Sequence, residues 1–357
     1  MNHPRTDPSG HGLVLIDKPA GWTSHDVVAR VRRLAGTRKV GHAGTLDPMA
    51  TGLLVLGVNR ATRLLTYLVG ADKEYTATIR LGQSTTTDDA EGQVRARAGV
   101  HADTEQRLPE QMAALTGAIE QVPSAVSAIK VDGERAYARV RAGEQVDLKA
   151  RPVHVETFET TGPFQPGRAE DGTPVLDVPV RVVCSSGTYI RALARDLGEA
   201  LGTGGHLTVL RRTRVGPLPV ADAQDLGAVS EGTEDLRIHG LTPVCKALFE
   251  VLDLNEAQAR AVRYGQGIEA PGPAPSSSRT MPATADGARA DSSAVAPGAA
   301  ADSATGAPGA GADSATGTPA ADANPAPVAA AHPDGRVIGL LQRRGGQWRP
   351  VLVFDPA

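Results

Sequence analysis

The sequence contains only two cysteines, Cys184 and Cys245, which lie far apart and form no Cys-x-x-Cys pair. A disulfide framework and a thiolate zinc site are therefore not expected. The nine histidines are scattered, and no two have the i, i+4 spacing that places two metal ligands on one helix face. We therefore expect no metal.

Long apolar runs are also missing, because no stretch approaches the ~18–20 residues needed to span a membrane. The first residues, MNHPRTDPSGHG, lack the basic and apolar segments of a secretory signal. No GxGxxG, Walker loop or Gly-x-Ser-x-Gly element occurs. These absences predict a cytoplasmic protein without a membrane partner and give no support to the commonest nucleotide-binding and hydrolase classes.

The formal net charge is −3, so positive charge is in slight deficit. The last segment, residues 335–357, is basic, with four arginines against one aspartate, whereas residues 271–334 are acidic. Overall charge therefore does not indicate a nucleic-acid partner, which must be argued from local patches. Two such patches, ARVRRLAGTRK at 29–39 and LRRTR at 210–214, are either solvated faces or phosphate contacts.

Bulky apolar residues are scarce between 271 and 332, where Ala, Gly, Pro, Ser, Thr and Asp dominate and ADSATG at 301 returns at 312. Such a composition buries too little apolar surface to offset the entropy of ordering the chain. We predict a disordered insertion over 271–332. After it, residues 336–356 indicate two short strands joined by a Gly-Gly turn.

The remaining chain mixes strand and helix patterns. Apolar residues alternate with polar ones at 74–82 and 175–184, as in half-buried strands, and 52–58 resembles a buried strand. Ser24 is expected to cap one helix and Thr188 another, the latter with apolar residues at helical spacing up to Gly202. Because βαβ spacing is not regular, the pattern predicts an α+β protein with a largely antiparallel sheet.

Asp47 is the only charged residue within GHAGTLDPMATGLL, residues 41–54. An aspartate before a proline most often makes a turn and accepts backbone N–H groups. The alternative is a carboxylate at the floor of a pocket that acts as a nucleophile or base. The small residues Gly41, Ala43 and Gly44 would let a substrate approach the backbone closely.

Arg191 lies in the first turn of the predicted helix, where the helix dipole disfavours a cation by up to ~1 kcal/mol. It is either a tolerated surface residue or the partner of a fixed anion, which would be a buried carboxylate or a phosphate. The acidic residues of TTTDDAEG, namely Asp88, Asp89 and Glu91, lack the spacing of a calcium loop, and a solvated turn is expected there.

Aromatic residues make up only 3% of the chain. Tyr75 at a strand start and Tyr189 beside Arg191 are candidate packing residues, but a site that holds a nucleobase also needs a flat side chain.

Five segments of the chain form a recognisable set: LIDKPAGWTSHDVVARVRR, GHAGTLDPMATGLLVLGVNRATRLL, DKEYTATIRLGQSTTTDDAEG, QVPSAVSAIKVDGERAYARVRAG and CSSGTYIRALARDLGEALGTGGHLTVLRRT. Their sequences and order resemble those of the bacterial TruB-type tRNA pseudouridine-55 synthases, and the resemblance covers about residues 12–218.

The resemblance implies a role for eight residues. Asp47 would be the nucleophile toward the target uridine, Arg191 its ion-pair partner, and Tyr75 the residue that stacks on the base and assists removal of the C5 proton. The substrate-binding positions implied by the same motifs are His42, Tyr189, Leu210, Lys18 and Lys130.

The same resemblance implies a pseudouridine synthase fold with a mixed, largely antiparallel central sheet over 1–240. A small β-rich PUA-like RNA-binding domain is expected over 241–357, interrupted by the insertion. The implied function is cofactor-free isomerisation of uridine 55 in the tRNA T-loop by base flipping, by a monomer.

Three alternatives remain. A guide-RNA-dependent, dyskerin-like synthase would be expected to have extra basic segments, where this chain has an acidic insertion. A non-catalytic tRNA-folding factor would keep the binding surface, and an unrelated hydrolase using Asp47 would need a second acid or a metal.

Overall fold

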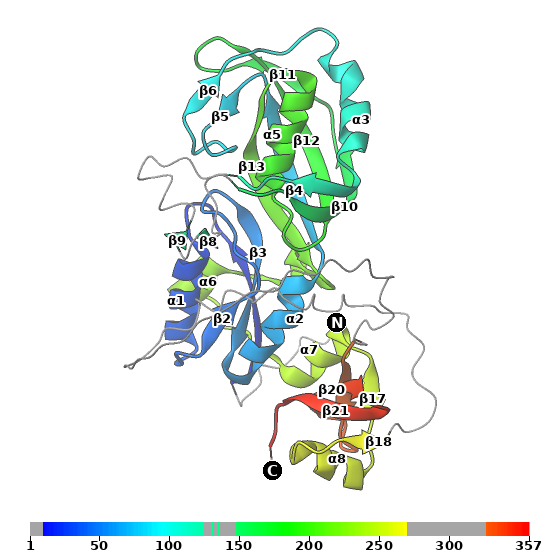
Figure 1. Cartoon of the computed structure of the whole chain (residues 1–357). Helices are drawn as coiled ribbons and strands as arrows, with labels where there is room; N and C mark the ends of the chain where they lie inside the picture. The colour runs from blue at the N-terminus through cyan, green and yellow to red at the C-terminus, as the bar shows by residue number, and fades with distance from the viewer. Residues whose placement is uncertain (1–9, 125–129, 132–133, 136–147, 270–325, 357) are drawn as a thin grey trace, which may run out of the picture.

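The computed structural model describes residues 10–124, 130–131, 134–135, 148–269 and 326–356 (Figure 1). A large sheet runs through the upper and middle parts of the molecule in this view, and a smaller sheet lies at the bottom near the C-terminus. Among the described helices, none is long and apolar enough to cross a membrane.

The large sheet has twelve strands, most of them antiparallel to their neighbours. Only two pairings are parallel, β1 with β15 and β3 with β13. The main path is β15 (Gln224–Asp225), β1 (Gly12–Lys18), β3 (Thr51–Val58), β13 (Gly205–Val215), β4 (Lys73–Leu81), β12 (Pro174–Cys184), β10 (Arg151–Thr160) and β7 (Gly117–Gln121). Four short strands pair beside this path: β2 (Val40–His42), β11 (Gln165–Arg168), β14 (Leu218–Pro219) and β16 (His239–Gly240). The predicted α+β class with a mixed, largely antiparallel sheet is confirmed.

Helices cover the sheet in three places, each with its own apolar core. α3 (Thr104–Ala114) and α5 (Ile190–Leu201) pack on β4, β10 and β12, while α1 (Ser24–Leu34) packs on one face of β1 and β3. The other face of β1 and β3 is covered by the 3₁₀ helix η1 (Asn59–Leu64) and α2 (Leu65–Gly70). The shorter elements are β5 (Ser84–Thr85), β6 (Val94–Ala96), β8 (Lys130–Val131), β9 (Glu134–Arg135), η2 (Val220–Asp222) and α6 (Leu226–Glu231).

The strand patterns of the sequence are confirmed, because buried and partly exposed residues alternate along β4 and β12. The helix caps are not. Thr23, not Ser24, is the N-cap of α1, since Asp26 completes a reciprocal capping box with it. α5 begins after Tyr189 without a side-chain cap, and Gln121 instead binds both the N–H and the carbonyl of Tyr189.

The small sheet has five strands in the order β17 (Val251–Asp253), β19 (Val328–Ala331), β20 (Val337–Arg344), β21 (Gln347–Val353) and β18 (Ile268–Glu269). α7 (Leu241–Leu248) and α8 (Glu256–Arg263) pack against it. The predicted hairpin is confirmed, with both turn glycines, Gly345 and Gly346, at positive φ.

The predicted insertion extends too far at its C-terminal end. Residues 270–325 lie outside the described residues, but the last part of 271–332 forms the buried strand β19. β19 is composed of valine and alanines, and such small side chains suffice because they fill the space between two cores, with Ala329 in one and Ala330 in the other. The first of these cores also contains residues of β1 and β3, so it joins the small sheet to the large one. The boundary at 240/241 stays a prediction.

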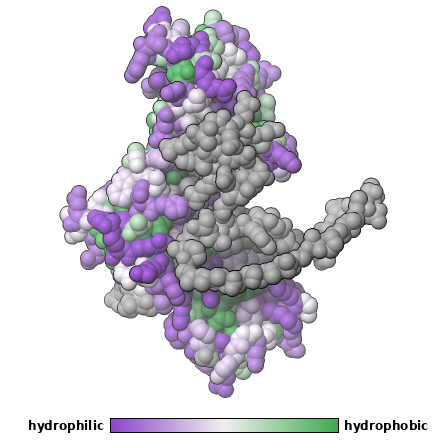
Figure 2. Space-filling view, turned by 60° about the vertical axis from the view of Figure 1, so that its left-hand side comes forward, coloured by the Kyte–Doolittle hydropathy of each residue, from purple (hydrophilic) through white to green (hydrophobic). Residues whose placement is uncertain are grey.

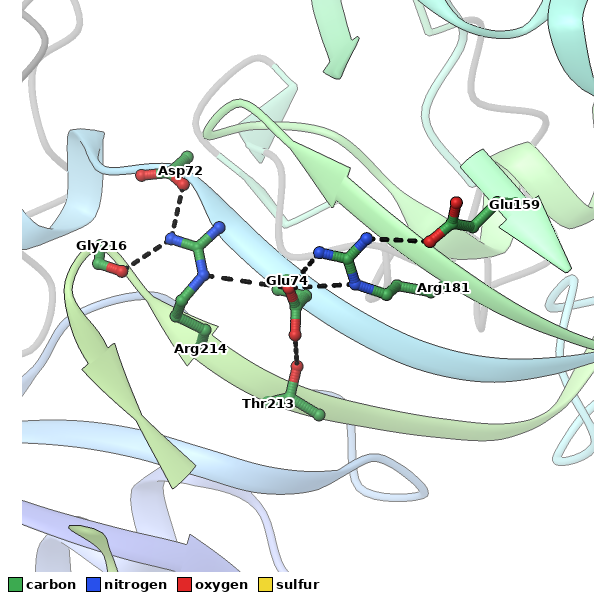
Figure 3. Close-up of polar contacts among 7 residues, drawn as sticks. All are labelled: Asp72, Glu74, Glu159, Arg181, Thr213, Arg214 and Gly216. Atoms are coloured by element: carbon green, nitrogen blue, oxygen red, sulfur yellow. Dashed lines mark hydrogen bonds and ion pairs between the residues drawn. The ribbon is translucent and has the colours of Figure 1, made fainter. Parts of the chain in front are cut away.

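Hydrophilic residues dominate the uncovered surface in Figure 2. On the open face of the large sheet, they form a cross-strand network around Glu74 (Figure 3). Its carboxylate accepts hydrogen bonds from Thr213 Oγ1 at 2.8 Å and from Arg181 Nη2 at 2.8 Å, and Arg181 also pairs with Glu159 at 2.9 Å. Arg214 extends the network to Asp72 at 2.7 Å. The network therefore ties β10, β12, β4 and β13 together.

Replacing Glu74 with glutamine should lower the free energy of unfolding by about 1–2 kcal/mol, because it weakens hydrogen bonds to a charged acceptor. Burial alone would raise the pKa of Glu74, but the hydrogen bonds from Thr213 and Arg181 outweigh it and hold the pKa below its usual value. The stabilisation is thus present above the ordinary glutamate pKa of about 4.3 and is lost as the pH falls through the folded-state pKa.

Urea denaturation of wild type and Glu74→Gln between pH 3 and 7 should show a difference in the free energy of unfolding that narrows on acidification. The control is Glu159→Gln, because the Glu159 side chain is 56% exposed. This substitution should lower the free energy of unfolding by less than about 1 kcal/mol. A difference in the free energy of unfolding that stays constant with pH would contradict the prediction.

Candidate active site

A pocket of about 270 Å³ opens beside the large sheet where five segments meet. They are the loop before β3, the end of α2, the start of β4, the segment leading into α5 with its first turn, and the middle of β13. The lining residues are Gly44, Thr45, Leu46, Asp47, Val69, Lys73, Tyr75, Ser185, Ser186, Gly187, Thr188, Tyr189, Ile190, Arg191, Leu210 and Arg212. Five of the eight residues implied by the resemblance therefore line one pocket, namely Asp47, Tyr75, Tyr189, Arg191 and Leu210.

The loop that carries Asp47 is held from behind. Ser24 Oγ accepts from the N–H of Leu46 at 2.9 Å and donates to its carbonyl at 3.2 Å. Lys18 Nζ donates to the carbonyls of Pro48 at 3.1 Å, Trp22 at 2.6 Å and Pro19 at 3.0 Å. These contacts fix the backbone on both sides of Asp47.

Lys18 is fully buried and does not line the pocket. Burial lowers its pKa to about 8, although Asp47 opposes the shift. The structure thus places Lys18 behind the loop that carries Asp47, with all three ammonium donors directed at backbone carbonyls. Its role toward a substrate stays a prediction.

Asp47 and Arg191 form the central ion pair of the pocket. Arg191 Nε lies 3.0 Å from Asp47 Oδ2, and its Nη2 donates to Oδ1 at 3.2 Å. The Arg191 side chain is 5% exposed, whereas the Asp47 carboxylate is 35% exposed toward the pocket. Burial raises the pKa of Asp47, and Arg191 acts against this shift and favours the ionised form.

Arg191 has a second acidic partner that the sequence analysis assigned to a solvated turn. Asp89 Oδ2 lies 3.4 Å from Arg191 Nη1, and the Asp89 side chain is 3% exposed. Its other oxygen accepts from the Glu91 N–H at 3.0 Å. The solvated-turn prediction is wrong for Asp89, because the turn folds back onto α5, where a buried guanidinium supplies the counter-charge.

Tyr75, Leu210 and Tyr189 form walls of the pocket. Tyr75 extends from β4 and Leu210 from the neighbouring strand β13, and both are buried. Tyr189 precedes α5 and is half-buried. Burial raises the pKa of Tyr75, while the positive charge of Arg212 opposes the change, so the phenol is neutral at ordinary pH. A flat ring, an isobutyl group and a second ring suit a pocket for a planar base.

His42 and Lys130 do not line the pocket. His42 lies in β2, and its ring meets the His25 ring edge-on at a centroid distance of 5.9 Å. Burial lowers the pKa of His42 to about 4, with the His25 and Arg212 charges adding to the effect. Lys130 belongs to β8, and the placement of its side chain lies outside the described part of the structure.

Lys73 and Arg212 line the pocket but were missed by the sequence analysis. Both follow from the period of two along a strand, since Lys73 shares a face with Tyr75 and Arg212 shares one with Leu210. The 210–214 patch is not a free basic surface either: Arg211 pairs with Asp17 at 2.6 Å, and Arg212 is 1% exposed. Among the described residues, no three His, Cys, Asp or Glu side chains are grouped to hold a metal ion.

Comparisons with known proteins decide the family. A protein of Arthrobacter sp. (strain FB24), "tRNA pseudouridine synthase B", is 52% identical over 97% of this chain and 97% of its own length. The chain belongs to the TruB family of pseudouridylate synthases. The profile "TruB family pseudouridylate synthase (N terminal domain)" matches residues 32–190. Two C-terminal profiles, "tRNA pseudouridylate synthase B C-terminal domain" and "tRNA Pseudouridine synthase II, C terminal", match 191–244 and 310–355.

Other relatives of this TruB-family chain agree. A Mycobacterium sp. (strain KMS) protein with the same name as the Arthrobacter protein is 54% identical over 98% of this chain and 97% of its own. Among solved structures, "Structure of H/ACA RNP bound to a substrate RNA containing 2'-deoxyuridine" matches with a TM-score of 0.61 at 21% identity, covering 99% of this chain and 93% of that one. At this identity the likeness supports the pseudouridine synthase fold alone.

Replacing Asp89 with asparagine should lower the pKa of Asp47, because Asp89 is a like charge that raises it. The pKa is measured by following the carboxyl carbon of Asp47 by NMR during a pH titration. The matched control is Asp88→Asn, since Asp88 pairs with Arg195 at 3.4 Å and should leave the pKa of Asp47 unchanged. An unchanged or raised pKa of Asp47 in Asp89→Asn would refute this coupling.

Proposed function

We propose that this protein isomerises uridine 55 in the T-loop of tRNA to pseudouridine, with Asp47 as the nucleophile. The observation that carries the proposal is the Asp47–Arg191 ion pair, which faces a pocket walled by Tyr75, Tyr189 and Leu210. The names of its close relatives support tRNA as the substrate.

The reaction breaks the N1–C1′ bond, turns the base and rejoins it through C5. The uridine must therefore leave its stack and enter a pocket that holds the base while it is detached. The pocket offers two aromatic side chains for the faces of the ring, and the partly exposed Asp47 carboxylate is the acidic group on its wall. Asp47 attacks the substrate as the carboxylate, and Tyr75 assists removal of the C5 proton.

Arg191 has a clear purpose in this mechanism. A desolvated carboxylate tends to take up a proton, and a protonated Asp47 would not be a nucleophile. The guanidinium holds both carboxylate oxygens, at 3.0 and 3.2 Å, and is itself held by Asp89 and by the carbonyl of Thr87 at 2.9 Å. The guanidinium therefore favours the ionised form of Asp47 and orients it before substrate binds.

The PUA-like part of the chain supplies the second RNA contact in this proposal. Its β20–β21 hairpin carries exposed arginines at its tip, including Arg343 and Arg344, which suit phosphate oxygens. The protein acts on tRNA without a guide RNA and as a monomer in the cytoplasm.

Asp47→Asn should abolish turnover while tRNA binding is largely retained, because the amide has nearly the same shape but is not a nucleophile. The assay uses unmodified tRNA labelled with tritium at uridine C5, and label release reports bond formation at C5. Release of label by Asp47→Asn would show that the nucleophile is another group. Binding without release by the wild type would favour a non-catalytic folding factor.

Arg191→Ala should reduce the single-turnover rate by roughly 10²–10³-fold, as expected for loss of an electrostatic contact that matters most in the transition state. The dissociation constant for tRNA should change much less, because Asp47 and Asp89, not RNA phosphates, satisfy the guanidinium. Filter binding and rapid quench measure the two quantities. Equal losses in rate and affinity would indicate a phosphate contact instead.

A further inference from the structure

Two buried cations on the pocket wall have no carboxylate at ion-pair distance within the described part of the chain. Lys73 Nζ donates only to backbone carbonyls, those of Val69 and Ala71, each at 2.6 Å. Arg212 donates from Nε to the Leu53 carbonyl at 2.8 Å and from Nη2 to the Gly44 carbonyl at 3.1 Å. Lys73 is 5% exposed and Arg212 1% exposed. Burying a charge without a counter-ion is costly, so its presence at a site calls for an explanation.

The excess of positive charge in the pocket comes from these two residues. The charged lining residues are Asp47, Arg191, Lys73 and Arg212. Arg191 is already matched, since it pairs with Asp47 and with Asp89. Lys73 and Arg212 are therefore left to act on whatever enters the pocket.

Lys73 and Arg212 lie together on the pocket wall beside Gly44, in the loop that carries Asp47. A methyl group built on Gly44 would be 3.3 Å from Arg212 Nη1 and 3.9 Å from Lys73 Cε. Arg212 also lies opposite Tyr75 in the register of the β4–β13 pair. An ammonium group has three donors, and two carbonyls occupy only two of those of Lys73, so one N–H is left for a ligand.

We propose that Lys73 and Arg212 are catalytic residues that stabilise negative charge on the uracil ring while the base is detached from the ribose. This inference rests on the proposed function. It assigns to the two cations the role of an oxyanion site for the carbonyl oxygens of the base.

The charge arises when the N1–C1′ bond breaks and its electron pair stays on the ring, delocalised over O2 and O4. The Asp47 carboxylate forms a covalent bond to the ribose C1′, and C5 of the turned base then displaces the carboxylate from C1′. The C5 proton leaves to a base and N1 gains a proton, so no atoms or charge are gained overall. If Asp47 attacks C6 first, the electrons of the C5–C6 double bond move through C4 onto O4, so O4 again carries negative charge.

A backbone phosphate is the other anion that two cations would attract. The burial of Lys73 and Arg212 argues against it, because a phosphodiester on the tRNA surface cannot reach side chains that are 5% and 1% exposed. A planar base inserted among Tyr75, Leu210 and Tyr189 is the part of the substrate that enters the pocket.

The test is the single-turnover rate at saturating tRNA, measured beside the tRNA dissociation constant and its salt dependence. Lys73→Met should slow the step by roughly 10²-fold with little change in affinity, and Lys73→Arg, which keeps the charge, should retain more than about a tenth of the wild-type rate. Lys73→Gln is a second neutral variant that keeps a donor for the carbonyls if the methionine variant does not fold. The control is Arg80→Met, on the opposite face of β4 and paired with Asp177, which should react at the wild-type rate.

Two results on the rate would overturn the inference: a folded neutral variant that reacts at the wild-type rate, or a folded Lys73→Arg variant that is as slow as the neutral variants. A third is a loss confined to tRNA affinity, with the salt dependence of that affinity lower in slope by about one, which would indicate a phosphate contact. Absence of pseudouridine with the wild type would instead refute the proposed function. The two failures are therefore distinguishable.

Discussion

The ion pair between Asp47 and Arg191 is the interaction on which the arrangement of the site depends. It joins residues 144 positions apart in the sequence, one in a loop before β3 and one in the first turn of α5. The pair forms only if β3 lies beside β13 and β13 beside β4, so that the loop and the helix meet over the same part of the sheet. Lys18 and Ser24 hold the loop, and Asp89 holds the arginine, so each partner is fixed by contacts of its own.

The two faces of β4 have different roles, one in the stability of the sheet and the other in the pocket. One face carries Lys73 and Tyr75 into the pocket, and the other carries Glu74 into the open ion-pair network of Figure 3. The difference in environment explains the difference in pairing. On the open face, where water screens charge, every arginine of the network has an acidic partner. In the pocket, Lys73 and Arg212 have no acidic partner among the described residues, which is the basis for the proposal that they act on the substrate.

Much of the fold could be predicted because it depends on local periodicity. The alternation along β4 and β12, the apolar stripe of α5 and the Gly-Gly hairpin are each contained in a short window. Of the predictions that failed, the cap of α5 and the extent of the insertion depend on distant partners. Gln121 takes the place of a cap at α5, and β19 is ordered by strands on both of its sides, although its composition alone indicated disorder.

The sequence by itself determined the family, the strand faces and the unusual positions of Asp47 and Arg191, because these follow from residue types and their order. The tertiary structure alone decided which charges meet. It placed Asp89 beside Arg191, Lys18 behind the Asp47 loop, and Lys73 with Arg212 beside Gly44. The physical reason is that the energy of a charge depends on its burial and on its neighbours within a few ångströms, and those neighbours come from strands far apart in the chain.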